Sequence, residues 1–224
     1  MVREHTARAF QGILAAASPQ PASPLLSGHD IDESEPRWNP PSPPTPRRVQ
    51  DLVGALTPLL RFCREARFVD QYFDASDPAF GETLSAFLRA AQQRRDPASV
   101  RLEVHTGCRP TQGAKITRPE DIAREKVDAC RRELATVLAR GTSLRVFVWS
   151  EDVPEPEQIH NRYVLTNAGS VLVPAGLDRG RPSYTDDLAL LSREQHALRW
   201  QQYSEGSGRL RRVLGPEVVT STAT

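Results

Sequence analysis

Proline sets the first limit on how this chain can fold. Residues 18–48 read SPQPASPLLSGHDIDESEPRWNPPSPPTPRR, and each proline removes a backbone donor and prevents a helix from continuing through it. This composition is typical of a linker or a disordered segment. We therefore expect residues 1–48 to form a disordered or linker-like N-terminal arm, with Trp38 docked on the folded body because tryptophan favours apolar contact.

The remaining chain is long enough for one sizeable core. The protein has 224 residues, of which 38% are hydrophobic, so we expect a single domain over residues 49–205 and a flexible C-terminal tail over residues 206–224. The 29 lysines and arginines nearly balance 28 aspartates and glutamates. This balance argues against bulk affinity for polyanions, so any anion site must be local.

Cysteine usage and hydropathy predict the compartment. The chain has three cysteines without C-x-x-C spacing, which argues against a disulfide framework or a cysteine-ligated metal and suits a reducing cytoplasm. No apolar run approaches the ~20 residues of a membrane helix, so we expect no transmembrane segment. The opening MVREHTARAFQGILAAASP contains Glu4 and Gln11, which interrupt the pattern of an export signal.

Strand and helix patterns alternate along the body. Because parallel neighbouring strands need helical crossovers, this order predicts an α/β fold with a mainly parallel sheet and flanking helices. The expected order is a helix from Val49, a strand ARFVDQYFD, a helix after Asp77-Pro78, a strand SVRLEVHTG, a helix from the Thr117/Glu120 capping box to Arg140, a strand SLRVFVWS, a hairpin IHNRYVLTN/SVLVPAG and a helix capped by Ser192.

The hairpin carries the most suggestive polar pair. His160 and Arg162 are two residues apart in an expected strand, so their side chains share one face. An imidazole can attack phosphorus or relay a proton, and a guanidinium offers a planar fork of donors to phosphate. The pair therefore predicts a site that binds a phosphodiester, in nucleic acid or in a lipid headgroup, and that cleaves it if His160 is active.

Several segments together resemble the phospholipase D superfamily. His160-x-Arg162-x4-Asn167 is similar to the H-x-K-x4-D motif of that superfamily, and the run Ala175-Gly176-Leu177-Asp178 follows it. The closest likeness is to the phospholipase-D-like C-terminal domain of MIT-domain proteins and its bacterial relatives, in which arginine also follows the histidine. The segment RFVDQYFD resembles their first strand.

The resemblance implies a metal-independent and cofactor-free phosphodiesterase with a phosphohistidine intermediate. Enzymes of the superfamily bring two motifs together, whereas this chain has one, so a homodimer would supply the second histidine, or His105 would serve instead. Arg162 in place of lysine keeps the charge but alters the geometry of the donors, which affects turnover most. By strand parity Asn167 faces away from His160 and braces the hairpin.

Other polar residues have both a functional and a structural interpretation. Asp178 either orients the ring of His160 or caps a turn. Asp74 lies beyond the first strand, where ligands gather in open α/β sheets, but it also starts the turn before a helix. His105 contacts substrate, or forms with Glu103 an acid-base pair or an edge-strand salt bridge. The remaining side chains with ligand-like character are expected to be structural: His196, Trp200 and Tyr203 as a packing stripe, and His5 and His29 as structural or solvated residues.

Two further functional hypotheses remain open. The same pocket would serve a non-catalytic adaptor that binds an anionic lipid or a partner protein, with the proline-rich arm recruiting the partner as an extended segment. The bacterial likeness also suggests a component of a defence operon.

Overall fold

The computed structural model describes residues 13–15, 25–27, 44–94, 96–108, 118–150, 159, 161–181, 183–207 and 210–223. The chain forms two units, residues 1–43 and residues 44–224. In the first, β1 (Ile13–Ala15) and β2 (Leu25–Ser27) form a short parallel pair. The expected docking of Trp38 lies outside the described residues.

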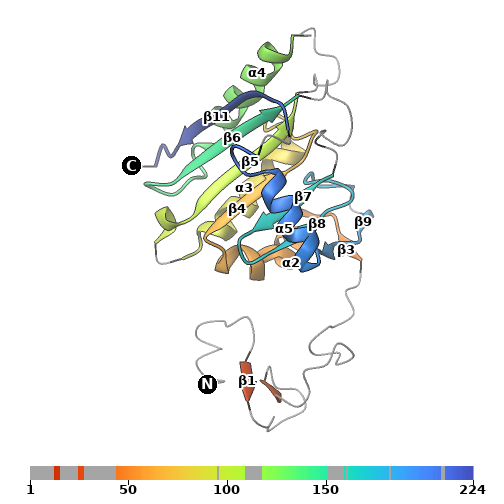
Figure 1. Cartoon of the computed structure of the whole chain (residues 1–224). Coiled ribbons are helices and arrows are strands. Elements are labelled where there is room, and N and C mark those ends of the chain that lie inside the picture. The colour runs from red at the N-terminus through yellow and green to blue at the C-terminus, as the bar shows by residue number, and fades with distance from the viewer. Residues whose placement is uncertain are drawn as a thin grey trace. The chain divides into compact units, whose positions relative to one another are not determined.

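The second unit is a seven-stranded sheet with helices on both faces (Figure 1). The strand order is β10-β8-β7-β4-β5-β6-β11. These strands are β4 (Glu65–Val69), β5 (Arg101–Gly107), β6 (Ser143–Trp149), β7 (Tyr163–Thr166), β8 (Gly169–Leu172), β10 (Ala189–Leu190) and β11 (Arg212–Thr220). A separate antiparallel pair joins β3 (Thr45–Pro46) to β9 (Thr185–Asp186), so the second unit begins before the expected boundary at residue 49.

The α/β class is confirmed, but the expectation of a mainly parallel sheet is wrong. Only the pairings of β4 with β5 and of β5 with β6, in the centre of the sheet, are parallel. Pairings of β7 with β4 and β8, of β8 with β10, and of β6 with β11 are antiparallel. A helical crossover allows two strands to pair parallel, whereas two strands joined by a tight hairpin turn must pair antiparallel.

The segment 206–224 is not the flexible tail that we expected. Within it β11 pairs with β6 along the edge of the sheet, and Val219 is buried in the core. The Gly215-Pro216 dipeptide, which breaks the strand pattern in the sequence, falls where the register shifts. Gly215 has a φ of 105°, and a Cβ atom there would lie 2.3 Å from the Val146 carbonyl oxygen, so the close approach of the two strands requires glycine.

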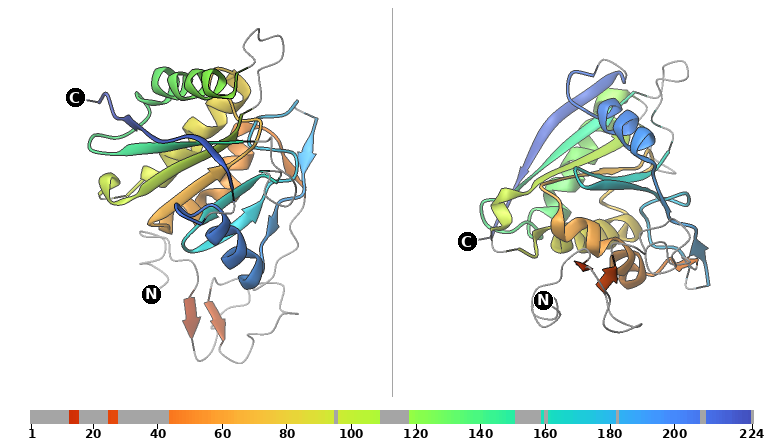
Figure 2. Two further views of the ribbon diagram at one scale, coloured as in Figure 1. Left: turned by 45° about the horizontal axis from the view of Figure 1, so that its top comes forward. Right: turned by 60° about the horizontal axis from the view of Figure 1, so that its bottom comes forward.

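Three helices cover one face of the sheet, and their apolar stripes build the main core (Figure 2). They are α2 (Val49–Phe62), α3 (Pro78–Gln92) and α4 (Pro119–Leu134), and a single 3-10 turn, η1 (Pro97–Ser99), precedes β5. As predicted, Asp77 caps α3 by accepting from the Ala79 amide. The helix α4 begins at Pro119 instead of at a Thr117 cap, and Thr117 lies outside the described residues.

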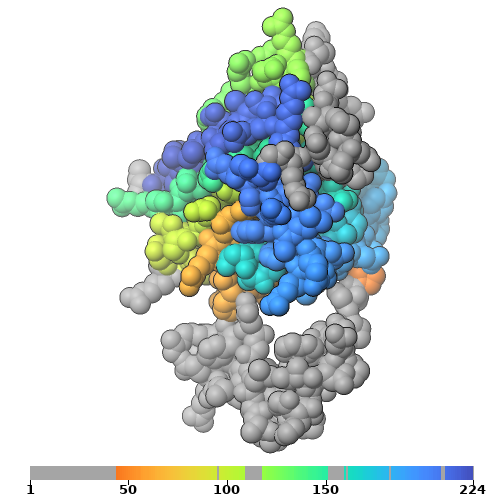
Figure 3. Space-filling view, viewed as in Figure 1, coloured from red at the N-terminus to blue at the C-terminus, as the bar shows by residue number. Residues whose placement is uncertain are grey.

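The opposite face of the sheet is covered by α5 (Arg193–Gln202), which lies across the front in Figure 3. Ser192 caps this helix with a capping box, as predicted. A second apolar cluster lies on this face, where Tyr203 packs with Phe147 and Leu165. Among the described residues, no helix has the length and apolar character needed to cross a membrane.

The pair Val218 and Val219 tests whether β11 belongs to the fold. Val219 is 1% exposed and Val218 is 50% exposed. Val219→Asp would bury an unpaired charge and should lower the free energy of unfolding by more than about 3 kcal/mol. Val218→Asp should change it by less than about 1 kcal/mol. Urea unfolding measures both, and equal small effects would contradict the placement of β11.

Candidate functional site

The candidate site lies where β4 ends. Asp70 follows β4, and its amide donates to the His105 carbonyl at 3.0 Å, which continues the pairing with β5. Gln71 also accepts from the Gly107 amide at 3.1 Å. In an open α/β sheet this edge, beyond the carboxyl ends of the parallel strands, is where ligand-binding loops gather.

Asp70 connects the two loops at this edge. One carboxylate oxygen accepts from the Tyr72 amide at 2.9 Å, and the other accepts from the Leu177 amide at 2.8 Å. The side chain is buried, and burial raises its pKa above the usual aspartate value. Burial outweighs the two backbone hydrogen bonds and the charge of Arg162, which lower the pKa. Asp70 is therefore a buried acid whose ionisation depends on its neighbours.

Gly176 allows the loop after β8 to approach Asp70. Its φ is 108°, which favours glycine. A Cβ atom at this position would lie 3.0 Å from Asp70 Oδ2 and 2.9 Å from Asp178 Oδ1. The small-residue run that follows the hairpin in the sequence thus serves close packing of a loop against two carboxylates.

Arg162 is half-buried next to this loop. Its Nη1 donates to the Pro174 carbonyl at 2.8 Å, and its guanidinium carbon lies 5.4 Å from the centre of the Tyr72 ring. No ion pair of the described residues includes Arg162. Its Nε is the one buried side-chain nitrogen or oxygen of the described residues without a hydrogen-bond partner. Such an atom costs free energy and needs a physical explanation.

Arg47 holds the same loop from the other side. It is buried, its Nη1 donates to Asp186 Oδ2 at 2.8 Å and to the Gly176 carbonyl at 3.2 Å, and its Nη2 donates to Asp178 Oδ1 at 2.9 Å. A further short bond joins Nη2 to the Asp178 carbonyl. Two carboxylates and two carbonyls thus surround one guanidinium, which anchors the loop and offsets one of the two negative charges.

Arg47 is the site residue that sequence reasoning missed. It lies in the segment assigned to the disordered arm, between prolines and the first helix, and it is 129 residues from Gly176 in the chain. The Arg47-Arg48 pair directly before a helical stripe was the one local signal that charge is needed there.

Of the predicted site residues His160, Arg162 and Asp178, the structure brings Arg162 and Asp178 together. His160 lies outside the described residues. Arg162 and Asp178 both lie next to Gly176. Asp178, however, is bound by Arg47 through its carboxylate and its carbonyl. In the described residues its partner is thus an arginine of the loop anchor.

His105 does not join this cluster, and its assignment as a ligand contact is wrong. Its side chain is 0% exposed, and its ring stacks on Phe147 with the ring centres 4.6 Å apart. Trp149 Nε1 donates to its Nδ1 at 3.1 Å, so the proton sits on Nε2, which lies 3.3 Å from a Glu103 oxygen. Burial lowers the pKa of His105. A neutral, sealed imidazole with both nitrogens engaged is structural.

Glu103 belongs to a buried charge cluster on the same face. Its carboxylate lies 3.2 Å from Arg67 Nε and 2.8 Å from Arg145 Nη1. Burial opposes its ionisation, but the hydrogen bond from His105 and these arginine charges outweigh burial and lower its pKa. Glu103 therefore forms its salt bridges with Arg67 and Arg145 and only a hydrogen bond with the neutral His105, and β5 is a central strand and not the expected edge strand.

Asp74 serves the turn before α3. One of its carboxylate oxygens accepts from the Ser76 amide at 2.9 Å and from the Ser76 hydroxyl at 2.6 Å. This is the turn-forming alternative that its position in the sequence left open. Asp74 is buried at 8% exposure.

Asn167 and His196 have structural contacts. The Asn167 side-chain oxygen accepts from the amides of Arg64 and Glu65 at 2.6 and 3.0 Å, so it braces the start of β4 against the β7–β8 hairpin. His196 Nδ1 lies 2.6 Å from the Ser170 hydroxyl and ties α5 to β8. These contacts agree with the expected bracing role of Asn167 and structural role of His196.

Among the described residues, no group of three or more histidine, cysteine, aspartate or glutamate side chains is placed to hold a metal ion. Comparison of the chain with models of protein families, with curated proteins and with solved structures finds no match.

The raised pKa of Asp70 predicts a pH dependence of folding. The folded protein keeps this proton at pH values where the unfolded chain has lost it, so the contribution of Asp70 to stability falls as the pH rises from about 3.9 through the raised pKa. This loss amounts to about 1.4 kcal/mol for each tenfold difference in proton affinity between the two states. Asp70→Asn has no carboxyl group to titrate, so its free energy of unfolding should decline less than that of the wild type as the pH rises through this range.

Urea unfolding at several pH values measures this difference, with Asp187→Asn as an exposed control that should follow the wild type. Identical pH slopes for the wild type and Asp70→Asn would show that the carboxyl is not perturbed.

Proposed function

We propose that this protein binds a phosphodiester at the carboxyl end of β4, with Arg162 as the anion-binding residue. The observation that supports this most directly is the state of the Arg162 side chain. It is half-buried, no carboxylate among the described residues pairs with it, and its Nε lacks a hydrogen-bond partner. An anionic ligand would supply the missing negative charge.

The charge balance of the cluster favours a singly charged ligand. Arg47 carries one positive charge against the two carboxylates of Asp178 and Asp186, so with Arg162 these four charges sum to zero before the buried Asp70 is counted. A phosphodiester carries one negative charge, whereas a phosphate monoester carries nearly two at neutral pH. The second charge of a monoester would add to the carboxylates of Asp178 and Asp186, which share the single charge of Arg47.

The resemblance to the phospholipase D superfamily extends the proposal to hydrolysis. His160 precedes Arg162 by two residues and would attack phosphorus, breaking the bond to the leaving oxygen, while a second histidine protonates that oxygen. Water would then cleave the phosphohistidine. His105 is sealed in the interior and His196 is bonded to Ser170, so we propose that a second copy of the chain supplies the second histidine in a homodimer.

The alternative is a non-catalytic binding module, and the contacts of Asp178 favour it. The carboxylate that the motif would use to orient His160 instead holds Arg47. Binding without turnover would suit an adaptor that recruits a partner through its proline-rich arm, or a component of a bacterial defence operon. The three cysteines are free, and we place either function in the reducing cytoplasm.

Binding and product formation should be measured with labelled single-stranded DNA, RNA and anionic vesicles. Arg162→Ala should weaken retention of the true ligand by about 10-fold or more, since a charge-assisted hydrogen bond is worth about 1.5–3 kcal/mol. Arg193→Ala, an exposed arginine of α5, should not weaken it. Product formation that is lost in His160→Ala and that EDTA does not inhibit would support an enzyme. The binding module is supported by retention without product.

The three ligands separate nucleic acid from lipid as the source of the phosphodiester. Retention of all of them with equal affinity by the wild type and Arg162→Ala would contradict the proposal. So would the absence of retention of any of them by the wild type.

A further inference from the structure

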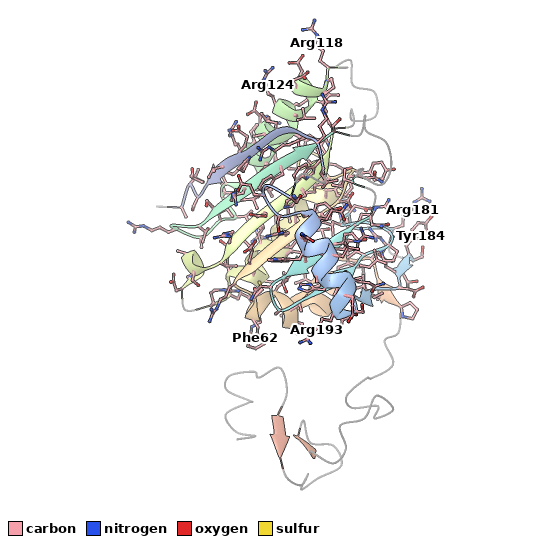
Figure 4. All side chains as sticks on the ribbon, viewed as in Figure 1. Phe62, Arg118, Arg124, Arg181, Tyr184 and Arg193 are labelled. Carbon is pink, nitrogen blue, oxygen red and sulfur yellow. The ribbon has the colours of Figure 1, made fainter. Side chains whose placement is uncertain are left out.

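Resting on that proposed function, we infer that Tyr184 and Arg181 form a second subsite, which stacks a base of a single-stranded nucleic acid bound at Arg162. Figure 4 shows the two labelled side chains together at the periphery of the domain. The Arg181 guanidinium carbon lies 5.9 Å from the centre of the Tyr184 ring. The subsite is distinct from the anion contact, because its contribution comes from an aromatic surface.

The same arrangement occurs twice near this edge of the sheet. Tyr72 is 42% exposed and lies under Arg162, and Tyr184 is 53% exposed and lies beside Arg181. Neither arginine belongs to an ion pair of the described residues. Exposed aromatic rings alternating with arginines are the composition that binds single strands, since bases stack on the rings and the cations contact the backbone phosphates.

Arg47 connects the two pairs. Its backbone amide donates to the Tyr184 carbonyl at 2.9 Å, while its guanidinium reaches the Gly176 carbonyl at 3.2 Å. Gly176 in turn adjoins Arg162, whose Nε would lie 3.8 Å from a Cβ atom at that position. One buried arginine therefore joins the segment that carries Tyr184 to the loop beside Arg162.

This surface fits a nucleic acid better than a membrane. Recognition of anionic lipid headgroups uses clusters of about 4–8 basic residues. Arg162 and Arg181, which have no ion pair among the described residues, are only two cations, and the same segments carry Asp178, which is 31% exposed, and the exposed Asp187. The electrostatic attraction is therefore weak, and stacking on two tyrosines supplies an interaction that does not depend on net charge.

The test compares a labelled oligothymidylate with an abasic oligonucleotide of the same length, measured by fluorescence anisotropy. Tyr184→Leu removes the ring but keeps an apolar side chain, and it should weaken oligothymidylate binding about 5- to 150-fold, as expected for loss of one stacked base. Tyr184→Phe keeps the ring and should bind within about twofold of the wild type. Phe62→Leu, at an exposed aromatic residue at the end of α2 (Figure 4), is the matched distal control and should not alter binding.

The two oligonucleotides separate this inference from the proposed function. The second subsite is supported if Tyr184→Leu weakens binding of oligothymidylate but not of the abasic strand, while Arg162→Ala weakens binding of both. If Tyr184→Leu binds oligothymidylate as the wild type does and Arg162→Ala does not, the subsite is excluded and the anion site stands. If the wild type binds neither strand but does bind anionic vesicles through Arg162, the nucleic-acid subsite is excluded and the proposed anion site stands.

Discussion

The geometry of the candidate site depends on the guanidinium of Arg47. This side chain is buried among Asp178, Asp186 and the Gly176 carbonyl, so it joins the segment before α2 to the loop after β8. Breaking a buried ion pair by removing one partner typically costs about 3–5 kcal/mol, because the other charge stays desolvated. Arg47 thus contributes indirectly to the proposed function, by holding the backbone that accepts from Arg162 and donates to Asp70.

Buried carboxylates on the α5 face of the sheet and at the carboxyl end of β4 have pKa values shifted in opposite directions. On the α5 face, Glu103 is surrounded by Arg67, Arg145 and the proton of His105, and its pKa is lowered. At the carboxyl end of β4, Asp70 receives two backbone donors but remains dominated by burial, and its pKa is raised. The first cluster is electrostatically satisfied. The second contains a perturbed acid and an arginine without an ion pair among the described residues, a combination more typical of a functional site.

Local patterns predicted the local structure well. The stripe and cap of α3, the capping box at Ser192 and the position of the hairpin follow from side-chain spacing alone. The prediction for Asn167 followed from strand parity and agrees with its contacts. These features depend on residues a few positions apart, which is the range over which spacing carries information.

Features that depend on distant residues were predicted poorly. The pairing of β11 with β6 is interrupted by Gly215-Pro216, and no local pattern indicates that Val219 is buried in the main core. His105 looked like a strand-end ligand because its burial under Phe147 and Trp149 comes from the next strand. Arg47 looked like part of a proline-rich arm because its carboxylate partners lie more than a hundred residues away.

Anion binding by Arg162 can be measured directly through the ¹⁵N resonances of its side chain. Dimethyl phosphate carries one negative charge, and trimethyl phosphate is its neutral counterpart. If Arg162 binds the anion, these resonances should shift saturably with dimethyl phosphate and should not shift with trimethyl phosphate. The same response to both compounds, or to neither, would contradict it.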